Sequence, residues 1–156
     1  MKSKTNKRNL NHVYNQVDML LAQCKKEDDY EVLSYIIKSC HMRYVRKYIE
    51  ERHNNSLLFS PLMNLNFKFI KFMFENIQIE ALKCSAIEDF HEYIRIEMIS
   101  ENRNRCTEET RVFRKEVFNF VANIDKEILI NALKLKNISD RTWNQGVADE
   151  ILRLSK

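Results

Sequence analysis

The chain has 156 residues, 44% of them apolar, which is enough for the core of one ordinary domain. Gly146 and Pro61 are its only glycine and proline, so the composition excludes Gly-rich phosphate-binding loops and β folds rich in tight hairpins. The formal net charge of +4 comes from a basic tip at residues 1–8, because the remaining 22 basic and 22 acidic residues balance. We expect this tip to be flexible and residues 9–156 to form a single helical-bundle domain.

The first predicted helices lie before residue 56. Apolar residues recur at helical spacing from about residue 10 to 25, and Asp28 or Asp29 is a suitable start for a second helix. The apolar face of that second helix includes Leu33 and Ile37 and continues to the polar cluster at residues 53–55. Both helices are therefore expected to present one apolar face to the core.

The segment 61–77 is predicted as one continuous helix, buried at the centre of the bundle. Ser60 is the expected cap, and Pro61 fits the first turn, where its missing N–H is not needed. Polar residues recur at spacings of four, three and four, which places them on one stripe facing water. We expect Phe69 at the centre of the core. The polar stripe consists of Asn64, Lys68, Lys71 and Glu75.

The next predicted helix follows directly and ends near residues 102–104. Its apolar positions have helical spacing, and its acidic residues are expected mostly on the outer face. The inward set is Ala86, Ile87, Phe90, Ile94 and Met98, and the outward set is Glu88, Asp89, Glu92 and Glu97.

The C-terminal third contains three further predicted helix starts. Thr107 followed by two glutamates suits the positive end of a helix dipole. Asp125 is expected to begin a shorter helix through Leu135, and Ser139 to cap a last one that contains Trp143. The chain is therefore predicted to be all-α, with about seven helices.

Cysteine spacing and hydropathy indicate the cellular compartment of the protein. The four cysteines are widely separated and form no C-x-x-C pair, which is typical of free thiols in a reducing compartment. The basic tip is followed by polar residues rather than an apolar segment, and no apolar run reaches the ~20 residues of a membrane span. We expect a cytoplasmic or nuclear protein without a membrane anchor, metal or cofactor.

The leading functional hypothesis is a non-enzymatic module for protein–protein interaction, an adaptor or regulator. The central helix carries a second apolar stripe beside the one assigned to the core, and an abundance of Phe, Met and Tyr suits adaptable apolar surfaces. If the first stripe packs the core, the second is covered by another helix, a ligand helix or a second copy of the chain. Its residues are Met63, Phe67, Ile70, Phe74 and Ile77.

Nucleic-acid binding is the first alternative. A basic cluster follows residue 102, and the C-terminal helices at residues 128–135 and from 139 onward resemble a helix-turn-helix pair. Arginine, asparagine and glutamine side chains are suited to base edges or phosphates. The cluster comprises Arg103, Arg105, Arg111, Arg114 and Lys115, and the residues near the last helix start are Arg141, Asn144 and Gln145.

A second alternative is catalytic. Arg46 and His53 are seven positions apart, with six residues between them, which places them two turns apart on nearly the same helix face. This spacing resembles the Arg-x(4–6)-His element of HEPN-type ribonucleases. The resemblance implies metal-independent RNA cleavage, with His53 as general acid or base and Arg46 stabilising negative charge. The pairing of Arg46 with Glu50 on a helix surface is the structural alternative.

Overall fold

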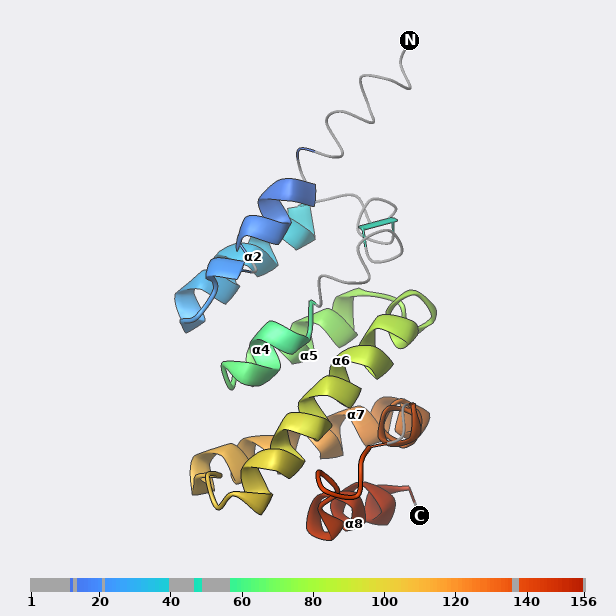
Figure 1. Ribbon diagram of the computed structural model, residues 1–156. Coiled ribbons are helices and arrows are strands. Elements are labelled where there is room, and N and C mark those ends of the chain that lie inside the picture. Colours follow the sequence, from blue (N-terminus) through green and yellow to red (C-terminus); the bar gives the residue numbers. More distant parts are fainter. Residues whose placement is uncertain are drawn as a thin grey trace. The chain divides into compact units, whose positions relative to one another are not determined.

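The structure is a computed structural model, and it describes residues 12, 14–20, 22–39, 47–48, 57–135 and 138–155. These residues form helices and turns and contain no strand, so the all-α prediction is confirmed. The chain divides into two compact units, the N-terminal unit Met1–Leu82 and the C-terminal unit Lys83–Lys156 (Figure 1). The prediction of a single domain stays a prediction, and the two units are described separately.

The N-terminal unit contains α2 (Glu27–Ser39), α4 (Phe59–Met63) and α5 (Phe67–Asn76), and residues 14–20 are also helical. Asp29 organises the start of α2, because its carboxylate accepts hydrogen bonds from the backbone N–H groups of Lys25 and Lys26, each at 3.1 Å. These bonds lower the pKa of Asp29. The expected continuation of this helix beyond Ser39 falls largely outside the described residues.

Phe69 is only 1% exposed, as predicted. Its ring packs against Tyr30 of α2 at a centroid distance of 5.2 Å and against Phe72 at 6.1 Å. Lys68 and Lys71 are exposed, and Lys71 forms an i,i+4 ion pair with Glu75 at 3.9 Å. The polar and apolar faces of α5 therefore agree with the sequence pattern.

The prediction of one unbroken helix from Pro61 to Asn76 is wrong, because the chain turns between α4 and α5. Leu65 adopts a left-handed conformation (φ 55°), and the N–H of Asn66 returns to the carbonyl of Pro61 at 2.8 Å, as in a Schellman helix end. The side chain of Asn66 then caps α5 by accepting a hydrogen bond from the N–H of Phe69 at 2.8 Å. Asn64 is exposed, as predicted, but it lies in this turn and not on α5, and its amide donates to the hydroxyl of Tyr30 at 2.9 Å.

The helix start was also misplaced. Helix α4 begins at Phe59 with Leu58 at the N-cap position, and Leu58 provides no side-chain cap. The hydroxyl of Ser60, the predicted cap, instead hydrogen-bonds to the hydroxyl of Tyr30 at 2.6 Å.

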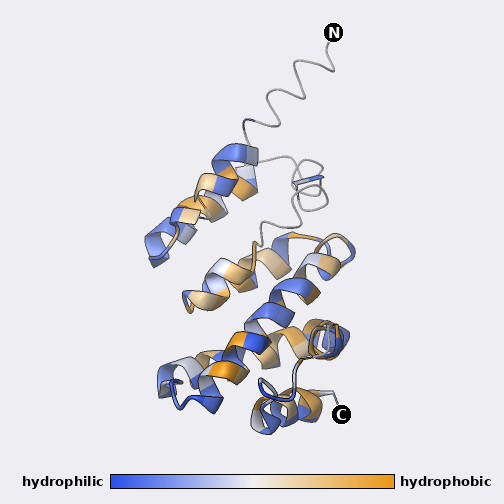
Figure 2. Ribbon diagram, in the orientation of Figure 1, coloured by the Kyte–Doolittle hydropathy of each residue, from blue (hydrophilic) through white to orange (hydrophobic). Residues whose placement is uncertain are grey.

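The C-terminal unit contains most of α6 (Ile79–Asn102), together with α7 (Glu108–Lys134) and α8 (Gln145–Leu154), which lie side by side (Figure 1). Each of these helices carries both apolar and hydrophilic residues (Figure 2). The core includes the edge-to-face contact of Tyr93 with Phe118, at a centroid distance of 6.1 Å. Among the described residues, no helix is long and apolar enough to cross a membrane.

Two predicted boundaries in this unit are confirmed and one is wrong. Thr107 caps α7 by accepting from the N–H of Thr110 at 3.1 Å, and α7 is broken at Asp125, whose φ and ψ are not helical. The last helix was predicted to start after Ser139, but its N-cap is Asn144, which accepts from the N–H of Val147 at 3.1 Å. The backbone carbonyl of Ser139 accepts the N–H groups of Thr142 and Trp143 in a turn that precedes α8.

Candidate functional site

The predicted partner-binding stripe does not form one exposed face. Ile70 and Ile77 are buried, at 0% and 4% exposure, and Phe67 and Phe74 are partly buried. Met63 is 43% exposed but lies at the end of α4, on the other side of the turn from α5. The structure therefore accounts for much of this stripe by packing within the chain, and its role in binding a partner stays a prediction.

The predicted basic cluster contains side chains in very different environments. Arg103, Arg105 and Lys115 are exposed. Arg111 is exposed but pairs with Glu101 at 2.9 Å. Arg114 is buried, with only 7% of its side chain exposed, so its placement in a phosphate-binding surface is wrong for this structure.

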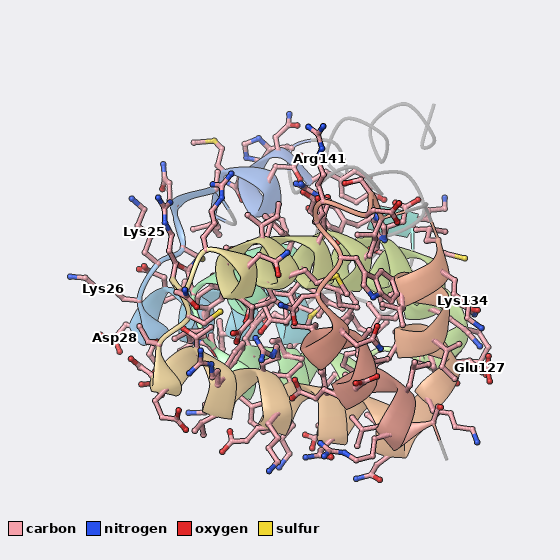
Figure 3. All side chains as sticks on the ribbon, turned by 60° about the horizontal axis from the view of Figure 1, so that its bottom comes forward. Lys25, Lys26, Asp28, Glu127, Lys134 and Arg141 are labelled. Atoms are coloured by element: carbon pink, nitrogen blue, oxygen red, sulfur yellow. The ribbon has the colours of Figure 1, made fainter. Side chains whose placement is uncertain are left out.

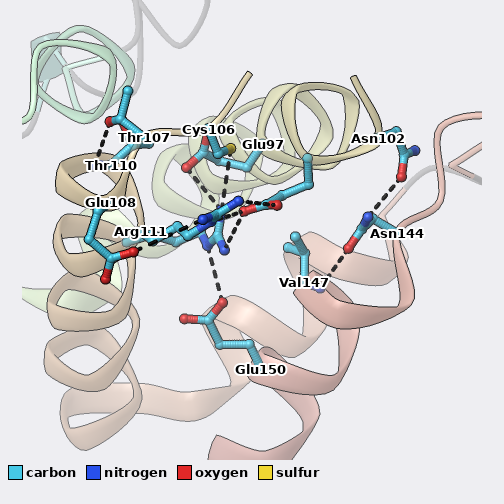
Figure 4. A network of polar contacts seen from close by, with 12 residues as sticks. Glu97, Asn102, Cys106, Thr107, Glu108, Thr110, Arg111, Asn144, Val147 and Glu150 are labelled. Carbon is cyan, nitrogen blue, oxygen red and sulfur yellow. Dashed lines mark hydrogen bonds and ion pairs between the residues drawn. The ribbon is translucent and has the colours of Figure 1, made fainter. Parts of the chain in front are cut away.

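Arg114 is instead the centre of a buried ion network that joins all three helices of the C-terminal unit (Figure 4). Each of its three side-chain nitrogens donates to a different glutamate. Nη1 lies 3.3 Å from Glu97 and Nη2 lies 3.1 Å from Glu101, both on α6. Nε lies 3.1 Å from Glu150 on α8. The guanidinium of Arg114 on α7 thus holds α6 and α8 by charge-assisted hydrogen bonds.

Two of the glutamates accept further hydrogen bonds from side chains around the network. Glu101 accepts two hydrogen bonds from Arg111, at 2.9 Å and 3.2 Å. The hydroxyl of Tyr93 donates to Glu97 at 3.2 Å. Glu97 and Asp89 were predicted on the outer face of α6. Both predictions are wrong, because the two residues are only 5% and 4% exposed. Two cations and three carboxylates therefore meet in a mostly buried volume.

The network shifts the pKa values of its members in opposite directions. Burial raises the pKa of Glu97, because its desolvation outweighs the attraction of Arg114. Hydrogen bonding from Arg111 is the main cause that lowers the pKa of Glu101 to about 2, against the effect of burial. Desolvation disfavours the Arg114 cation, but the carboxylates outweigh it and raise the pKa of Arg114.

These opposite shifts predict different pH profiles for two matched variants. Glu101, whose pKa falls on folding, stabilises the protein above its usual pKa of 4.5 and loses that contribution as the pH falls toward about 2. Glu97, whose pKa rises on folding, favours folding most below 4.5 and contributes less as the pH rises through its folded pKa. We expect Glu101→Gln to destabilise the protein more than Glu97→Gln at pH 7.

Urea unfolding between pH 2.5 and pH 7 measures this difference. Glu101→Gln should flatten the loss of stability on acidification, whereas Glu97→Gln should preserve that loss. Identical profiles for the two variants would show that the two carboxyl groups do not have the opposite roles assigned to them.

The residues of the predicted helix-turn-helix are not arranged for reading base edges. Ten residues separate the end of α7 at Lys134 from the start of α8 at Gln145, in place of the three- or four-residue turn of that motif. Asn144 is engaged as the α8 cap, and its amide donates to Asn102 at 2.7 Å. Gln145 donates to Asp149 at 2.7 Å. Arg141 is exposed on the connecting loop (Figure 3).

Asn102 positions this loop against the end of α6. Its amide donates to the backbone carbonyl of Thr142 at 2.9 Å and approaches that of Trp143 at 3.4 Å (Figure 4 shows its contact with Asn144). The backbone before α8 is thus held by Asn102, while the middle of α8 is held by Arg114 through Glu150. The first tie holds the loop that contains Trp143 against α6, and the second holds α8 against α7.

An open groove of about 810 Å³ lies between the end of α7 and α8. Trp143 and Leu152 line it and remain 37% and 38% exposed. Leu135, which follows the lining residue Lys134 in the chain, is 44% exposed. Lys134, labelled in Figure 3, lies in the last turn of α7 and also lines the groove. The described lining residues are Leu133, Lys134, Ile138, Ser139, Asp140, Trp143 and Leu152. We call this feature the C-terminal groove.

The remaining predicted sites lie outside the described residues. These are Arg46 and His53 of the catalytic alternative, and the basic tip at residues 1–8 also lies outside the described part of the chain. Within the described part of the chain, no group of three or more His, Cys, Asp or Glu side chains is arranged to hold a metal ion. Comparison with protein-family models, curated proteins and solved structures finds no match to this chain.

Proposed function

We propose that the protein is a helical interaction module that binds another protein through the C-terminal groove. The observation that supports this most directly is the exposure of Trp143 and Leu152 on the wall of one groove. Large apolar side chains that stay exposed around a concavity are typical of protein-binding surfaces, and tryptophan is enriched among the residues that dominate binding energy.

The ties around the groove support the same proposal. Asn102 holds the backbone beside Trp143, and Arg114 holds α8, which carries Leu152, through Glu150, so both apolar side chains of the groove lie on elements tied to another helix. A preformed surface loses less conformational entropy on binding. The Arg114 network, in this proposal, is a structural support for the groove and not a catalytic centre.

An adaptor or regulatory role in the cytoplasm or nucleus fits these features. Cys24, Cys84 and Cys106 are free thiols, as expected for a protein in a reducing compartment.

Partner capture with matched variants tests the proposal. The full chain should be immobilised as the wild type, as Trp143→Ser and as Ile124→Ser; Ile124 is 43% exposed on α7 and does not line the groove. We expect proteins retained by the wild type and by Ile124→Ser to bind Trp143→Ser at least roughly tenfold more weakly, since loss of an aromatic anchor removes more than about 1.4 kcal/mol. Equal retention by all three, with circular dichroism confirming that each is folded, would contradict the proposal.

Nucleic-acid binding stays a prediction with a reduced set of residues. Arg103, Arg105, Lys115 and Arg141 are exposed, whereas Arg114 is buried and Arg111 is paired. Binding through the exposed cations would weaken steeply with salt.

A further inference from the structure

Helix α8 brings an excess negative charge into the Arg114 network. The other two helices balance each other, since Glu97 and Glu101 of α6 face Arg114 and Arg111 of α7. Helix α8 adds the carboxylate of Glu150, 3.1 Å from Nε of Arg114, and the described ion pairs of this network include no cation from α8 (Figure 4). Three carboxylates then meet two cations, which leaves a net charge of −1 when all of them are ionised.

Glu97 is the carboxyl group of the network best placed to hold a proton. Its side chain is 6% exposed, against 16% for Glu101 and 15% for Glu150. Glu101 accepts two hydrogen bonds from Arg111, which keep it ionised. Burial raises the pKa of Glu97 despite the attraction of Arg114. An uncompensated charge is most costly where water is excluded, so a proton on the most buried carboxylate removes the excess charge at the least cost.

The neighbours of Glu97 offer no other way to balance the charge. Burial raises the pKa of the Tyr93 hydroxyl and of the Cys106 thiol, so both stay neutral. The titratable and charged groups around Glu97 are Tyr93 and Glu101 of α6, Cys106 of the α6–α7 connection, Arg111 and Arg114 of α7, and Glu150 of α8.

We propose that docking of α8 on α6 and α7 takes up a proton, which Glu97 holds. With this proton the network is neutral and α8 is firmly docked. As the pH rises above 4.5 and through the folded pKa of Glu97, the proton is lost and α8 loosens. Glu150 is the carboxylate that yields, because it accepts one hydrogen bond, from Arg114, whereas Glu97 accepts two and Glu101 three.

Helix α8 is in this way a pH-sensitive latch on the C-terminal unit. The latch requires the contacts of Arg114 and no partner in the C-terminal groove, so it stands or falls separately from the proposed function.

Amide hydrogen exchange of α8 measures the coupling. The opening constant of the amides at residues 147–154 should be measured in the full chain from about pH 5 to about pH 8.5, with the pH dependence of intrinsic exchange removed. We expect it to rise with pH by up to about tenfold per pH unit, because opening releases the proton of Glu97, and then to level off. Glu97→Gln, which is neutral at every pH, should lose this rise.

Groups elsewhere in the unit contribute equally to the wild type and to Glu97→Gln, so the difference between the two profiles reports the proton on Glu97. A wild-type opening constant that does not rise with pH overturns the inference. A rise that is unchanged in Glu97→Gln does so as well.

A second variant tests whether the proton is coupled to α8. Glu150→Gln removes the negative charge that α8 brings, while its amide oxygen can still accept the hydrogen bond from Arg114. We expect a much smaller rise with pH than in the wild type. Glu116→Gln, exposed on α7, is the control and should keep the wild-type rise, with circular dichroism showing that every variant is folded. A full rise in Glu150→Gln would overturn the coupling of the proton to α8.

Discussion

Replacement of Arg114 with methionine is expected to destabilise the C-terminal unit by about 3–5 kcal/mol, the range for removing one member of a buried ion pair. Methionine preserves much of the apolar volume of the side chain, so the effect comes mainly from the charge. Glu97, Glu101 and Glu150 would then lie close together without the cation to which all three bind. Urea unfolding followed by Trp143 fluorescence measures the loss.

The pH dependence separates this mechanism from simple loss of packing. The deficit of Arg114→Met should shrink as the pH falls below about 4.5, because protonation removes the repulsion among the carboxylates. Lys115→Met is the matched control at the neighbouring exposed position, and a change within about 0.5 kcal/mol is expected there. A deficit below about 1 kcal/mol, or one that does not depend on pH, would argue against a network centred on Arg114.

The second large effect is expected at Phe69. Phe69→Ala should cost roughly 3–5 kcal/mol, because it removes a fully buried ring that contacts Tyr30 and Phe72. Lys68→Ala and Lys71→Ala should change stability by less than about 1 kcal/mol, since their ion pairs are exposed and alanine is a good helix former. Urea unfolding followed by circular dichroism, which reports on the N-terminal unit as well, compares the three variants.

The outcome that counts against this assignment is a reversed order. If either lysine variant lost more stability than Phe69→Ala, the burial pattern of α5 would be wrong, and with it the assignment of Phe69 to the core.

Local chemistry was sufficient to predict the helices but not every boundary. The cap at Thr107 and the break at Asp125 were predicted because hydroxyl and carboxylate side chains mark helix starts directly. The turn at Asn64–Asn66 was missed because a leucine occupies the left-handed position where glycine is usual. Asn66 was the available signal, since asparagine is a preferred cap, but the polar stripe through Asn64 masked it.

The buried network shows a second limit of sequence patterns. Glu97 and Glu101 continue the spacing of Phe90 and Ile94, and Arg114 precedes Phe118 by four residues, so all three fall on apolar faces. That spacing was the signal for buried charge. Their pairing depends on how α6, α7 and α8 pack, and Glu150 is 36 residues from Arg114, so the periodicity of a single helix does not determine it.

The C-terminal groove also could not be predicted from the sequence. Trp143 was predicted to lie on a last helix capped by Ser139, whereas it lies on the loop before α8. A hydrogen bond between Asn102 and Asn144, which are 42 residues apart, ties the end of that loop to α6. Contacts of this kind become visible only when the packing of the unit is known.

Site-specific photo-crosslinking tests the central claim most directly. A photoreactive phenylalanine analogue placed at position 143, or at position 124 as the exposed control on α7, should be activated in cells that express the full chain. We expect protein adducts at position 143 and few or none at position 124, and the mass of the main adduct will distinguish a second copy of the chain from another protein. Adducts of equal yield at the two positions, or none at position 143, would contradict the assignment of the C-terminal groove as a protein-binding surface.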